Sequence, residues 1–561
     1  MDQSPRPPSL APELKRPAAR KGARGEHFIW LAGAALGVCL LMIIGLLGIV
    51  IGNGAGYFWP HQLVAVDAED GAKVLGALVR TEEFRKFSPD SGNAVRLLTR
   101  SQFKIGNRDI YGVDFKWVQH PQIVNWQLPE QAVALERTEY GDFYGFLEAV
   151  KEDGKTVAQG AAAWALFENR RPEARALARQ WMHIQKVEIG EINRQLQAAA
   201  LRAKRALRML GGTPELPGTL ALFAAETNQL NAAFETLKTR VGALQKQATR
   251  FTAVMRTIDG KEKEIPLAEI VRATKPNLLG FGDRWRYYLA KTWEFISADP
   301  RESNTEGGIF PAIFGTVMMT LLMSVAVVPL GVLAALYLRE YARQGFWVRL
   351  VRIAVNNLAG VPSIVFGVFG LGFFVYFVGG TIDQLFYADS LPAPTFGTGG
   401  ILWASLTLAL LTVPVVIVAT EEAIAAVPRG AREGSLALGA SKFQTVWRIV
   451  LPASMPGILT GLILAMARGA GEVAPLMITG VVKLAPNLPL DGQFPLLHLD
   501  RKFMHLGFHI YDVGFQSPNV EAAKPMVFAT TLLLILVVVA LNLSAMILRD
   551  KIRKKYRSGA F

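Results

Sequence analysis

A charged pair stands inside one of the long apolar runs of the sequence, the stretch ARGAGEVAPL at residues 467–476. Ionisable residues within a membrane helix are costly, and they usually mark a transport path or pair with each other. On a continuous helix Arg468 and Glu472 would share one face and could pair. A guanidinium holds a tetrahedral oxyanion through two parallel hydrogen bonds, and Glu472 could accept the proton of a partly protonated phosphate, which sulfate lacks. The alternative is an ion pair that only joins helices.

A second pattern lies in the connection before that run. It reads REGSLALG at residues 432–439 and, nine residues later, IVLP at 449–452. Small residues allow close packing on another surface, a glycine can end a short helix and a proline can begin the next one. The residues that we expect to form this contact surface are Glu433, Gly434, Ser435, Gly439, Ile449, Leu451 and Pro452. The alternative is an ordinary amphipathic connector.

Two further patterns do not indicate chemistry. The letters GKT at 154–156 match the end of a phosphate-binding loop, but Ala149 stands where its first glycine is required. His498, His505 and His509 fall in one connection with no cysteine nearby. We therefore expect no metal, no cofactor and no enzymatic activity, and we interpret the histidines as part of a surface that docks another protein. Any ATP hydrolysis must come from a partner.

These residues lie in a chain that is predicted to cross a membrane six times. Its 561 residues are 51% hydrophobic and 19% charged, which is too apolar for an ordinary soluble protein. A membrane helix needs about 20 apolar residues, and runs of this kind occupy 28–51, 309–338, 353–378, 401–419, 455–481 and 526–548. Four of the last five runs contain a proline, which in lipid requires protein or a cavity to satisfy the freed backbone groups. A moving path needs such breaks and a simple anchor does not.

The distribution of Lys and Arg predicts the orientation. Segments 1–27, 339–352, 420–451 and 549–561 hold 6, 4, 4 and 6 of these residues, whereas 379–400 holds none and 482–525 holds four. The positive-inside rule therefore places both termini on the cytoplasmic side of the membrane. We expect this membrane to be the bacterial inner (plasma) membrane. The net charge of +14 is then mostly a topology signal, and no nucleic-acid partner is expected.

The remaining organisation follows from the local patterns. Residues 1–27 are expected to be a disordered basic tail, 28–52 the first membrane helix, 53–308 a large outer α+β segment, 309–548 a unit of five membrane helices, and 549–561 a basic tail. Alternation at Phe103 and Ile105, and from Tyr111 to Trp117, predicts strands.

A helical hairpin is predicted within the outer segment. Apolar steps of three and four in 189–210 and 230–251 predict two helices. The string GGTPELPG at 211–218 predicts the turn between them. The hairpin is either a spacer that packs on itself or a docking surface.

About residues 300–548 resemble a known family. The loop at 432–452 resembles the EAA loop of ABC importer permeases (EAA, three residues, G, nine residues, I-x-L-P), with Gly434 and Ser435 in place of two alanines. The strings NTEGG at 304–308, FGT at 314–316, NLAGVPSIVFG at 357–367 and RGAGEVAPL at 468–476 closely resemble the PstA family of phosphate-specific transport permeases.

The resemblance implies an all-α membrane protein with an ABC importer permease core, whose EAA-like loop seats in an ATPase. It implies a PstC-like permease subunit as heterodimer partner, two PstB-like ATP-binding subunits, a periplasmic phosphate-binding protein, membrane lipid, and phosphate as the cargo that Arg468 helps to move. Another oxyanion, such as sulfate or molybdate, is the first alternative. A sensory receptor or a membrane enzyme is disfavoured, because the longest inner segment has about thirty residues and no catalytic set can be assembled.

Overall fold

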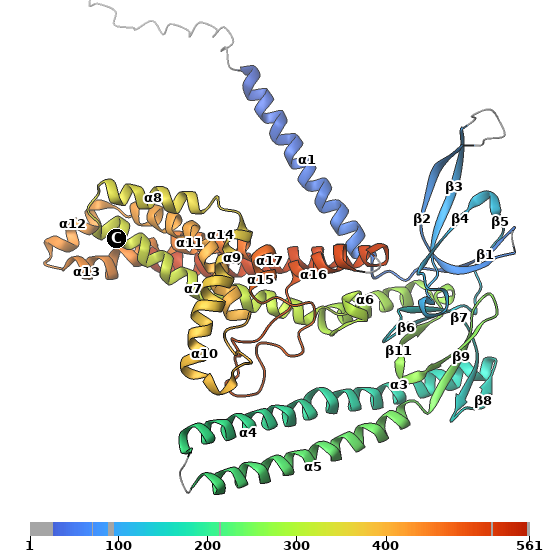
Figure 1. Ribbon diagram of the computed structural model, residues 1–561. Coiled ribbons are helices and arrows are strands. Elements are labelled where there is room, and N and C mark those ends of the chain that lie inside the picture. Colours follow the sequence, from blue (N-terminus) through green and yellow to red (C-terminus); the bar gives the residue numbers. More distant parts are fainter. Residues whose placement is uncertain (1–25, 70, 88–94, 212–214, 518–519, 558–561) are drawn as a thin grey trace, which may run out of the picture.

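The computed structural model describes residues 26–69, 71–87, 95–211, 215–517 and 520–557. The basic tail predicted at 1–27 lies outside these ranges except for its last two residues, which begin α1 (Glu26–Gly56). Figure 1 shows a bundle of long helices with a strand-rich part (residues 57–308) at one end, on the right, and the short helices α12 and α13 at the other end.

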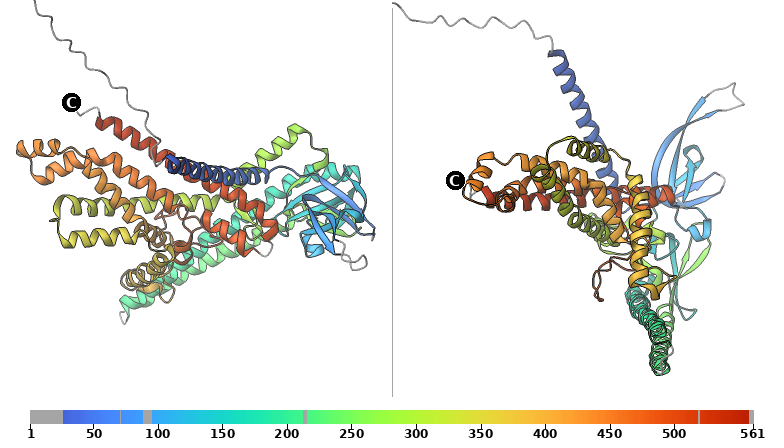
Figure 2. Two further views of the ribbon diagram at one scale, coloured as in Figure 1. Left: turned by 90° about the horizontal axis from the view of Figure 1, so that it is seen from above. Right: turned by 60° about the vertical axis from the view of Figure 1, so that its left-hand side comes forward.

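The prediction of six membrane helices is confirmed. Six helices are long and apolar enough to cross a membrane, at Phe28–Gly56, Phe310–Tyr341, Ser363–Phe386, Ile401–Ala425, Lys442–Gly469 and Val520–Lys554. The fourth is central, with 67% of its most apolar window buried, and the first is peripheral, with 6% buried. Figures 1 and 2 show the first helix leaning away from the others.

The long regular elements of the part that follows the strand-rich part are all helices within the described residues. Its elements are α7 (Phe310–Leu336), α8 (Phe346–Leu358), α9 (Ser363–Phe369), α10 (Gly380–Phe386), α11 (Ile401–Ala425), α12 (Arg429–Ala437), α13 (Lys442–Thr445), α14 (Leu451–Gly469), α15 (Ala474–Thr479), α16 (Leu506–Tyr511) and α17 (Val520–Arg557). Helix α11 packs against α7 and α14, and α17 packs against α14 and α1. Because α17 continues to Arg557, most of the predicted tail at 549–561 is helical; residues 558–561 lie outside the described ranges.

Two predicted spans have the wrong boundaries. The run at 353–378 is divided, because α8 ends at Leu358 and the next membrane helix starts at Ser363, after Pro362. A proline disfavours helical backbone in the residue before it. The run at 455–481 is divided as well: the span begins earlier, at Lys442, and ends at Gly469. Each of these two apolar runs thus contains a non-helical stretch between two helices.

The strand-rich part contains two antiparallel sheets. One has the order β4-β3-β2-β1-β5, built from β1 (Leu63–Ala68), β2 (Lys73–Phe87), β3 (Val95–Lys104), β4 (Phe115–Gln119) and β5 (Ile123–Gln127). The other has the order β10-β9-β7-β6-β11 with β8 on β7, built from β6 (Val133–Arg137), β7 (Asp142–Glu152), β8 (Lys155–Gln159), β9 (Phe251–Arg256), β10 (Glu262–Pro266) and β11 (Ile270–Thr274). Of the GKT string at 154–156, Gly154 lies in the turn between β7 and β8, and Lys155 and Thr156 begin β8. No helix follows the string directly, so a phosphate-binding loop is excluded.

The predicted strand from Tyr111 is wrong in its first part. Tyr111 ends a single helical turn, α2 (Arg108–Tyr111), and only the residues from Phe115 onward form a strand, β4. Gly112 has a φ of 72°, a left-handed conformation that ends the turn. Phe103, by contrast, lies in β3 and is fully buried, as its alternation with Ile105 predicts.

The predicted helical hairpin is confirmed. Helix α3 (Ala161–His183) covers the second sheet and continues through a π-helical turn into α4 (Ile189–Leu210), and α5 (Leu216–Ala248) returns antiparallel to it. Phe251, predicted to be helical, instead begins β9. Of the predicted turn at 211–218, residues 212–214 lie outside the described ranges, and residues 216–218 already belong to α5.

The hairpin runs back along one side of the bundle, as Figure 1 shows. Near its tip, Arg205 Nε and Arg208 Nη2 lie 3.0 and 3.2 Å from Oδ2 of Asp389, in the connection after α10. Further along, Gln493 Nε2 donates to Glu191 Oε2 at 3.0 Å. The hairpin is therefore fastened to the two connections, 387–400 and 480–505, that lie on this face of the core, called the loop face below. Helix α6 (Phe281–Ser297) and the short ribbon β12 (Pro300–Arg301) and β13 (Glu306–Gly307) lead from the sheets into α7.

Candidate functional site

The charged pair lies at a break between two helices. Arg468 occupies the last turn of α14, which ends at Gly469, and Glu472 lies in the non-helical stretch before α15. The backbone N–H of Glu472 donates to the carbonyl of Gly469 at 3.3 Å, so the chain turns instead of continuing the helix. The prediction that Arg468 and Glu472 share one helix face is therefore wrong, because Pro475 in the first turn of α15 starts a new helix.

The two side chains nevertheless face each other. Arg468 Nε lies 3.8 Å from Glu472 Oε1, and the side chains are 34% and 22% exposed. This separation is longer than an N–H···O hydrogen bond. Among the described residues the side chain of Arg468 has no other ion pair or hydrogen bond. A guanidinium carries five donors, so most of them remain available for an anion.

Two glycines lie in close contact with side chains at this break. A Cβ on Gly469 would lie 2.5 Å from Sδ of Met323 in α7, and one on Gly507 in α16 would lie 2.8 Å from Cγ2 of Val473. A side chain at either glycine would therefore displace its neighbour. The break is thus held between α7 and α16 by glycine packing, the device that lets membrane helices approach closely.

A second break faces the first one, and the sequence reasoning missed it. The chain between α8 and α9 leaves the helix after Leu358. Leu358 and Val361 pack in the same apolar cluster as Met466 of α14 and Leu476 of α15. The signal was present in Gly360-Val361-Pro362, since Gly and Pro two residues apart favour a break. Two discontinuous helices that meet in this way are a recurrent architecture for substrate sites in transporters.

The histidines do not form the predicted docking surface. His505 and His509 are 0% and 2% exposed, and His498 is bonded to Asp491 (Nε2 to Oδ1, 3.0 Å). The ring of His505 accepts a hydrogen bond from the N–H of Gly507 at 3.1 Å and so caps α16. Burial lowers the pKa of His505 to about 4, which keeps the ring neutral. Among the described residues no group of three His, Cys, Asp or Glu is arranged to hold a metal ion.

The predicted contact surface is a pair of short helices at the end of the bundle opposite the strand-rich part. Helix α12 carries Glu433, Gly434 and Ser435, and none of its residues is buried. Gly439 follows the helix with a φ of 83°, as its predicted role as helix terminator requires. Helix α13 then starts with a capping box in which Ser441 Oγ accepts from the N–H of Gln444 at 3.2 Å.

Polar contacts fix the two short helices to each other and to the bundle. Ser435 Oγ lies 3.0 Å from Oγ1 of Thr445 in α13. Arg432 Nη1 lies 3.1 Å from Oε1 of Glu340, at the end of the second span. Ser435 thus makes a specific contact that neither alanine of the EAA pattern could make.

Large apolar side chains are exposed on this surface. Leu438 is 90% exposed, Phe443 65% and Trp447 60%, and the rings of the last two are stacked with centroids 6.2 Å apart. Phe443 and Trp447 lie in the first turns of the span that begins at Lys442, where lipid can cover them, whereas Leu438 precedes that span. A large apolar side chain exposed to water at such a position is typical of a protein contact site. The geometry therefore favours a docking surface over an ordinary connector.

Ile449, Leu451 and Pro452 lie deeper than the two short helices. Ile449 and Leu451 are partly buried, and Pro452 follows a π-helical turn at Val446–Val450. Pro452 was expected to start the span, but the membrane helix runs from Lys442. The π-helical turn ends two residues before Pro452, which has no N–H to donate to the preceding turn.

Comparison with known proteins agrees with this arrangement. Residues 327–558 match the family described as "Binding-protein-dependent transport system inner membrane component". A probable phosphate transport system permease protein PstA of Methanocaldococcus jannaschii is 34% identical over 241 residues, which is 42% of this chain and 74% of that protein. PstA 1 of Mycobacterium tuberculosis is 35% identical, over 43% of this chain and 71% of its own length.

One further relative and one solved structure are also similar to this chain. PstA of Yersinia pestis is 34% identical over 46% of this chain and 77% of its own length. Among solved structures, an inward-facing MetNI methionine ABC transporter aligns with 43% of this chain and 94% of its own, at 19% identity and a TM-score of 0.31. From the extent of the matches to three PstA proteins, this chain belongs to the PstA family of ABC importer permease subunits.

Proposed function

We propose that this chain is the permease subunit of an importer that moves inorganic phosphate across the bacterial inner membrane. The observation that carries the proposal is the position of Arg468, at a break between two membrane helices and with most of its guanidinium donors unused. The similarity to phosphate transport permeases supports phosphate as the cargo. Sulfate and molybdate are the weaker alternatives, because these relatives are named as phosphate transport permeases.

The charged pair suits a partly protonated oxyanion. Arg468 would hold two phosphate oxygens through its planar fork. Glu472, 3.8 Å away, would accept the proton that HPO₄²⁻ or H₂PO₄⁻ carries and sulfate at neutral pH does not. The two side chains are not hydrogen-bonded to each other, so both can turn toward an anion that binds beside them. A tight structural pair would instead be bonded at about 2.8 Å.

The driving force would come from two PstB-like ATP-binding subunits. The exposed residues Leu438, Phe443 and Trp447 would enter a cleft of the ATPase, with Glu433 and Gly434 at its edge. Movements of the ATPase would then pass through the contact between Arg432 and Glu340 to the second span. This chain would hydrolyse no nucleotide itself.

The other partners follow from the proposed orientation. Both termini would lie in the cytoplasm, and the strand-rich part and the loop face would lie in the periplasm. A PstC-like permease subunit would complete the membrane pathway, and a periplasmic phosphate-binding protein would deliver the cargo at the loop face. A reporter fused after Leu210 should be active only outside and one fused after Gly430 only inside; the reverse pattern would overturn the orientation.

The decisive experiment is phosphate uptake by proteoliposomes that contain the assembled transporter. Arg468→Lys keeps the charge but loses the planar fork, so uptake should fall at least tenfold, and Arg468→Gln should abolish it. The matched control is Arg349→Gln, on the exposed side of α8, which should transport normally. Full uptake by Arg468→Gln at equal expression would reduce the pair to a structural contact.

A further inference from the structure

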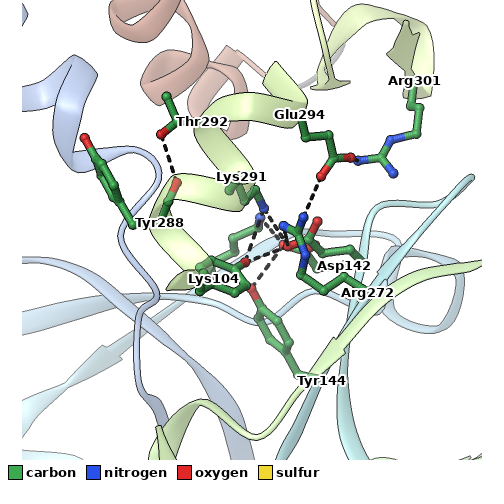
Figure 3. Close-up of polar contacts among 11 residues, drawn as sticks. Lys104, Asp142, Tyr144, Arg272, Tyr288, Lys291, Thr292, Glu294 and Arg301 are labelled. Carbon is green, nitrogen blue, oxygen red and sulfur yellow. Dashed lines mark hydrogen bonds and ion pairs between the residues drawn. The ribbon is translucent and has the colours of Figure 1, made fainter. Parts of the chain in front are cut away.

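A cavity of about 460 Å³, lined by apolar and charged residues, lies where the strand-rich part meets the membrane bundle. Its walls come from the last turn of α1, the strands β2, β3, β6 and β7, helix α6, and the first turns of α17. Figure 3 shows charged side chains from β3, β7, β11 and α6 close together, and Lys104, Asp142 and Lys291 among them line the cavity. None of these residues belongs to the transport path or to the contact surface described above.

Almost all the charges at the cavity are paired. The pairs are Lys104 Nζ–Asp142 Oδ2 (2.6 Å), Lys291 Nζ–Glu136 Oε1 (2.6 Å), Arg301 Nη2–Glu294 Oε1 (2.8 Å) and Arg80 Nη2–Glu521 Oε1 (3.2 Å). Burial alone would raise the pKa of Glu136, but Lys291 and Arg272 lower it to about 2. Lys291 and Glu136 thus form a buried, ionised pair.

Glu306 in β13 is the exception among the carboxylates that line the cavity. Within the described residues its side chain has no ion pair and no hydrogen bond. Burial, and then the negative charge of Asp142, raise its pKa to about 7, although Lys104 and Lys291 act in the opposite direction. Among the described residues its carboxylate is thus the one at the cavity without a bonded cation. A guest with a positive group would supply the missing partner.

The cavity also offers donors for a negative group. Each lysine ammonium has three N–H donors, and at both Lys104 and Lys291 a carboxylate takes one at 2.6 Å. Tyr287 OH lies 3.4 Å from Nζ of Lys291 and accepts at most one more. Both lysines line the cavity, so the remaining donors can bind phosphate oxygens. A guest that carries an ammonium and a phosphate together matches both features.

The position of the cavity indicates where such a guest comes from. Two of its walls are ends of membrane helices, the α1 residues Gly52, Asn53 and Gly56 and the α17 residues Ala522 and Pro525. Lipid head groups lie at this level of a membrane helix, just beyond the hydrocarbon. The wall residues on both helices are mostly small, which leaves space between the cavity and the helix ends.

The two helices also leave apolar surface for acyl chains. They touch near the cavity, where a Cβ on Gly54 would lie 2.9 Å from the carbonyl oxygen of Phe528. From there α1 leans away from the bundle (Figure 1), and its apolar side chains are exposed along almost its whole length. Acyl chains can therefore follow α1 from a head group bound in the cavity.

We propose that this cavity binds the head group of an amine-bearing phospholipid, such as phosphatidylethanolamine. The ammonium lies beside Glu306, the phosphodiester accepts from Lys104 and Lys291, and the acyl chains lie along α1 and α17. The bound lipid thereby joins the strand-rich part to the membrane bundle. This site is independent of which anion the chain transports.

The test is lipid retention by the purified full-length chain. The protein is incubated with an equal mixture of phosphatidylethanolamine and phosphatidylglycerol, washed in lipid-free detergent and analysed by native mass spectrometry. The wild type should retain the amine lipid at least tenfold over phosphatidylglycerol. Glu306→Gln should lose at least tenfold of this retention, and Glu83→Gln, a change on the exposed surface of β2, should behave as the wild type.

A second variant blocks the space and leaves the charges intact. Nothing lies within 4 Å of a Cβ at Gly52, so Gly52→Phe should fold and still reduce retention. Equal retention of both lipids, or undiminished retention by Glu306→Gln, would overturn the proposal. Free phosphoethanolamine distinguishes the source: if it raises the melting temperature in amine-free nanodiscs as much as the lipid does, the ligand is a soluble zwitterion and the lipid assignment is wrong.

Discussion

A Cβ placed on Gly367 would lie 2.7 Å from Cα of Pro475. The two residues belong to α9 and α15, the short helices that follow the two breaks. The helices therefore touch backbone to backbone beside the charged pair. This contact fixes the relative position of the breaks.

Gly367→Ala should disturb this contact specifically. The neighbour is backbone and cannot rotate away, so we expect a loss of about 1–3 kcal/mol in unfolding free energy, as for other overpacked sites, and slower phosphate uptake. Gly372→Ala is the matched control in the same membrane helix, because nothing lies within 4 Å of a Cβ there. Denaturant unfolding in detergent measures both variants. Equal stability would show that α9 and α15 separate easily.

Glu472→Gln distinguishes the two roles of the charged pair. If Glu472 only neutralises Arg468, the amide leaves a cation unpaired in the membrane part, and folded yield falls together with transport. We expect instead a normally folded protein whose preference for phosphate over sulfate falls at least tenfold. Competition between labelled phosphate and sulfate in proteoliposomes measures this preference. A low yield with unchanged selectivity would contradict the cargo role.

Gly439→Arg should prevent binding of the ATPase without preventing membrane insertion. Nothing in this chain lies within 4 Å of a Cβ at Gly439, so a side chain there would not clash within this chain. A lost association would then result from a clash with the partner or from backbone strain at this position. The φ of 83° is left-handed, a region that costs most residues about 1–2 kcal/mol and that asparagine tolerates. Gly439→Asn should therefore retain association in a pull-down assay. Normal pull-down of the arginine variant would refute the contact surface.

Glu306 should make stability depend on pH in a particular window. Its pKa is raised from 4.5 to about 7, so the folded state keeps a proton that the unfolded state has already lost. Stability therefore falls as pH rises from about 4.5 to about 7 and stays constant above that range. Glu136, Asp142, Lys104 and Lys291 face Glu306 and are paired with one another.

The measurement is the melting temperature of Glu306→Gln relative to the wild type, in nanodiscs without amine lipid. The melting temperature of the variant should rise relative to that of the wild type between pH 4.5 and pH 7. The difference should then stay constant up to pH 8. Glu83→Gln, with an exposed carboxylate, should show no such trend. An advantage independent of pH would mean that Glu306 is ionised throughout.

The number of membrane helices could be predicted from the sequence, because each apolar run is a local property. The breaks could not be placed in the same way. Residues 359–362 and 470–473 are as apolar as their surroundings, apart from Glu472, so hydropathy does not show where helical hydrogen bonds give way to the turns at Gly360 and Glu472. Arg468 and Glu472 were found because charge in an apolar run is visible locally. Their geometry was not, because it depends on where α14 ends.

The cavity could not be predicted for a related reason. Lys104, Asp142, Lys291 and Glu306 come from β3, β7, α6 and β13, and nothing in their local sequence indicates that they meet. The helical hairpin was predictable because its seam repeats within each helix. The order of the strands was not, because β9 pairs with β7 across the whole hairpin.

The attachment of the hairpin tip to Asp389 has a mechanical consequence. The helix from Ala161 to Leu210 is about 75 Å long at 1.5 Å per residue, so a rotation of the sheets by a few degrees would swing a free tip through several ångströms. Asp389 anchors the tip to the core, and Lys291 with Glu136 anchors the sheets at the other end. A rod pinned at both ends cannot pivot. The strand-rich part and the connection after α10 should thus move together, which makes the hairpin a strut between that connection and the sheets.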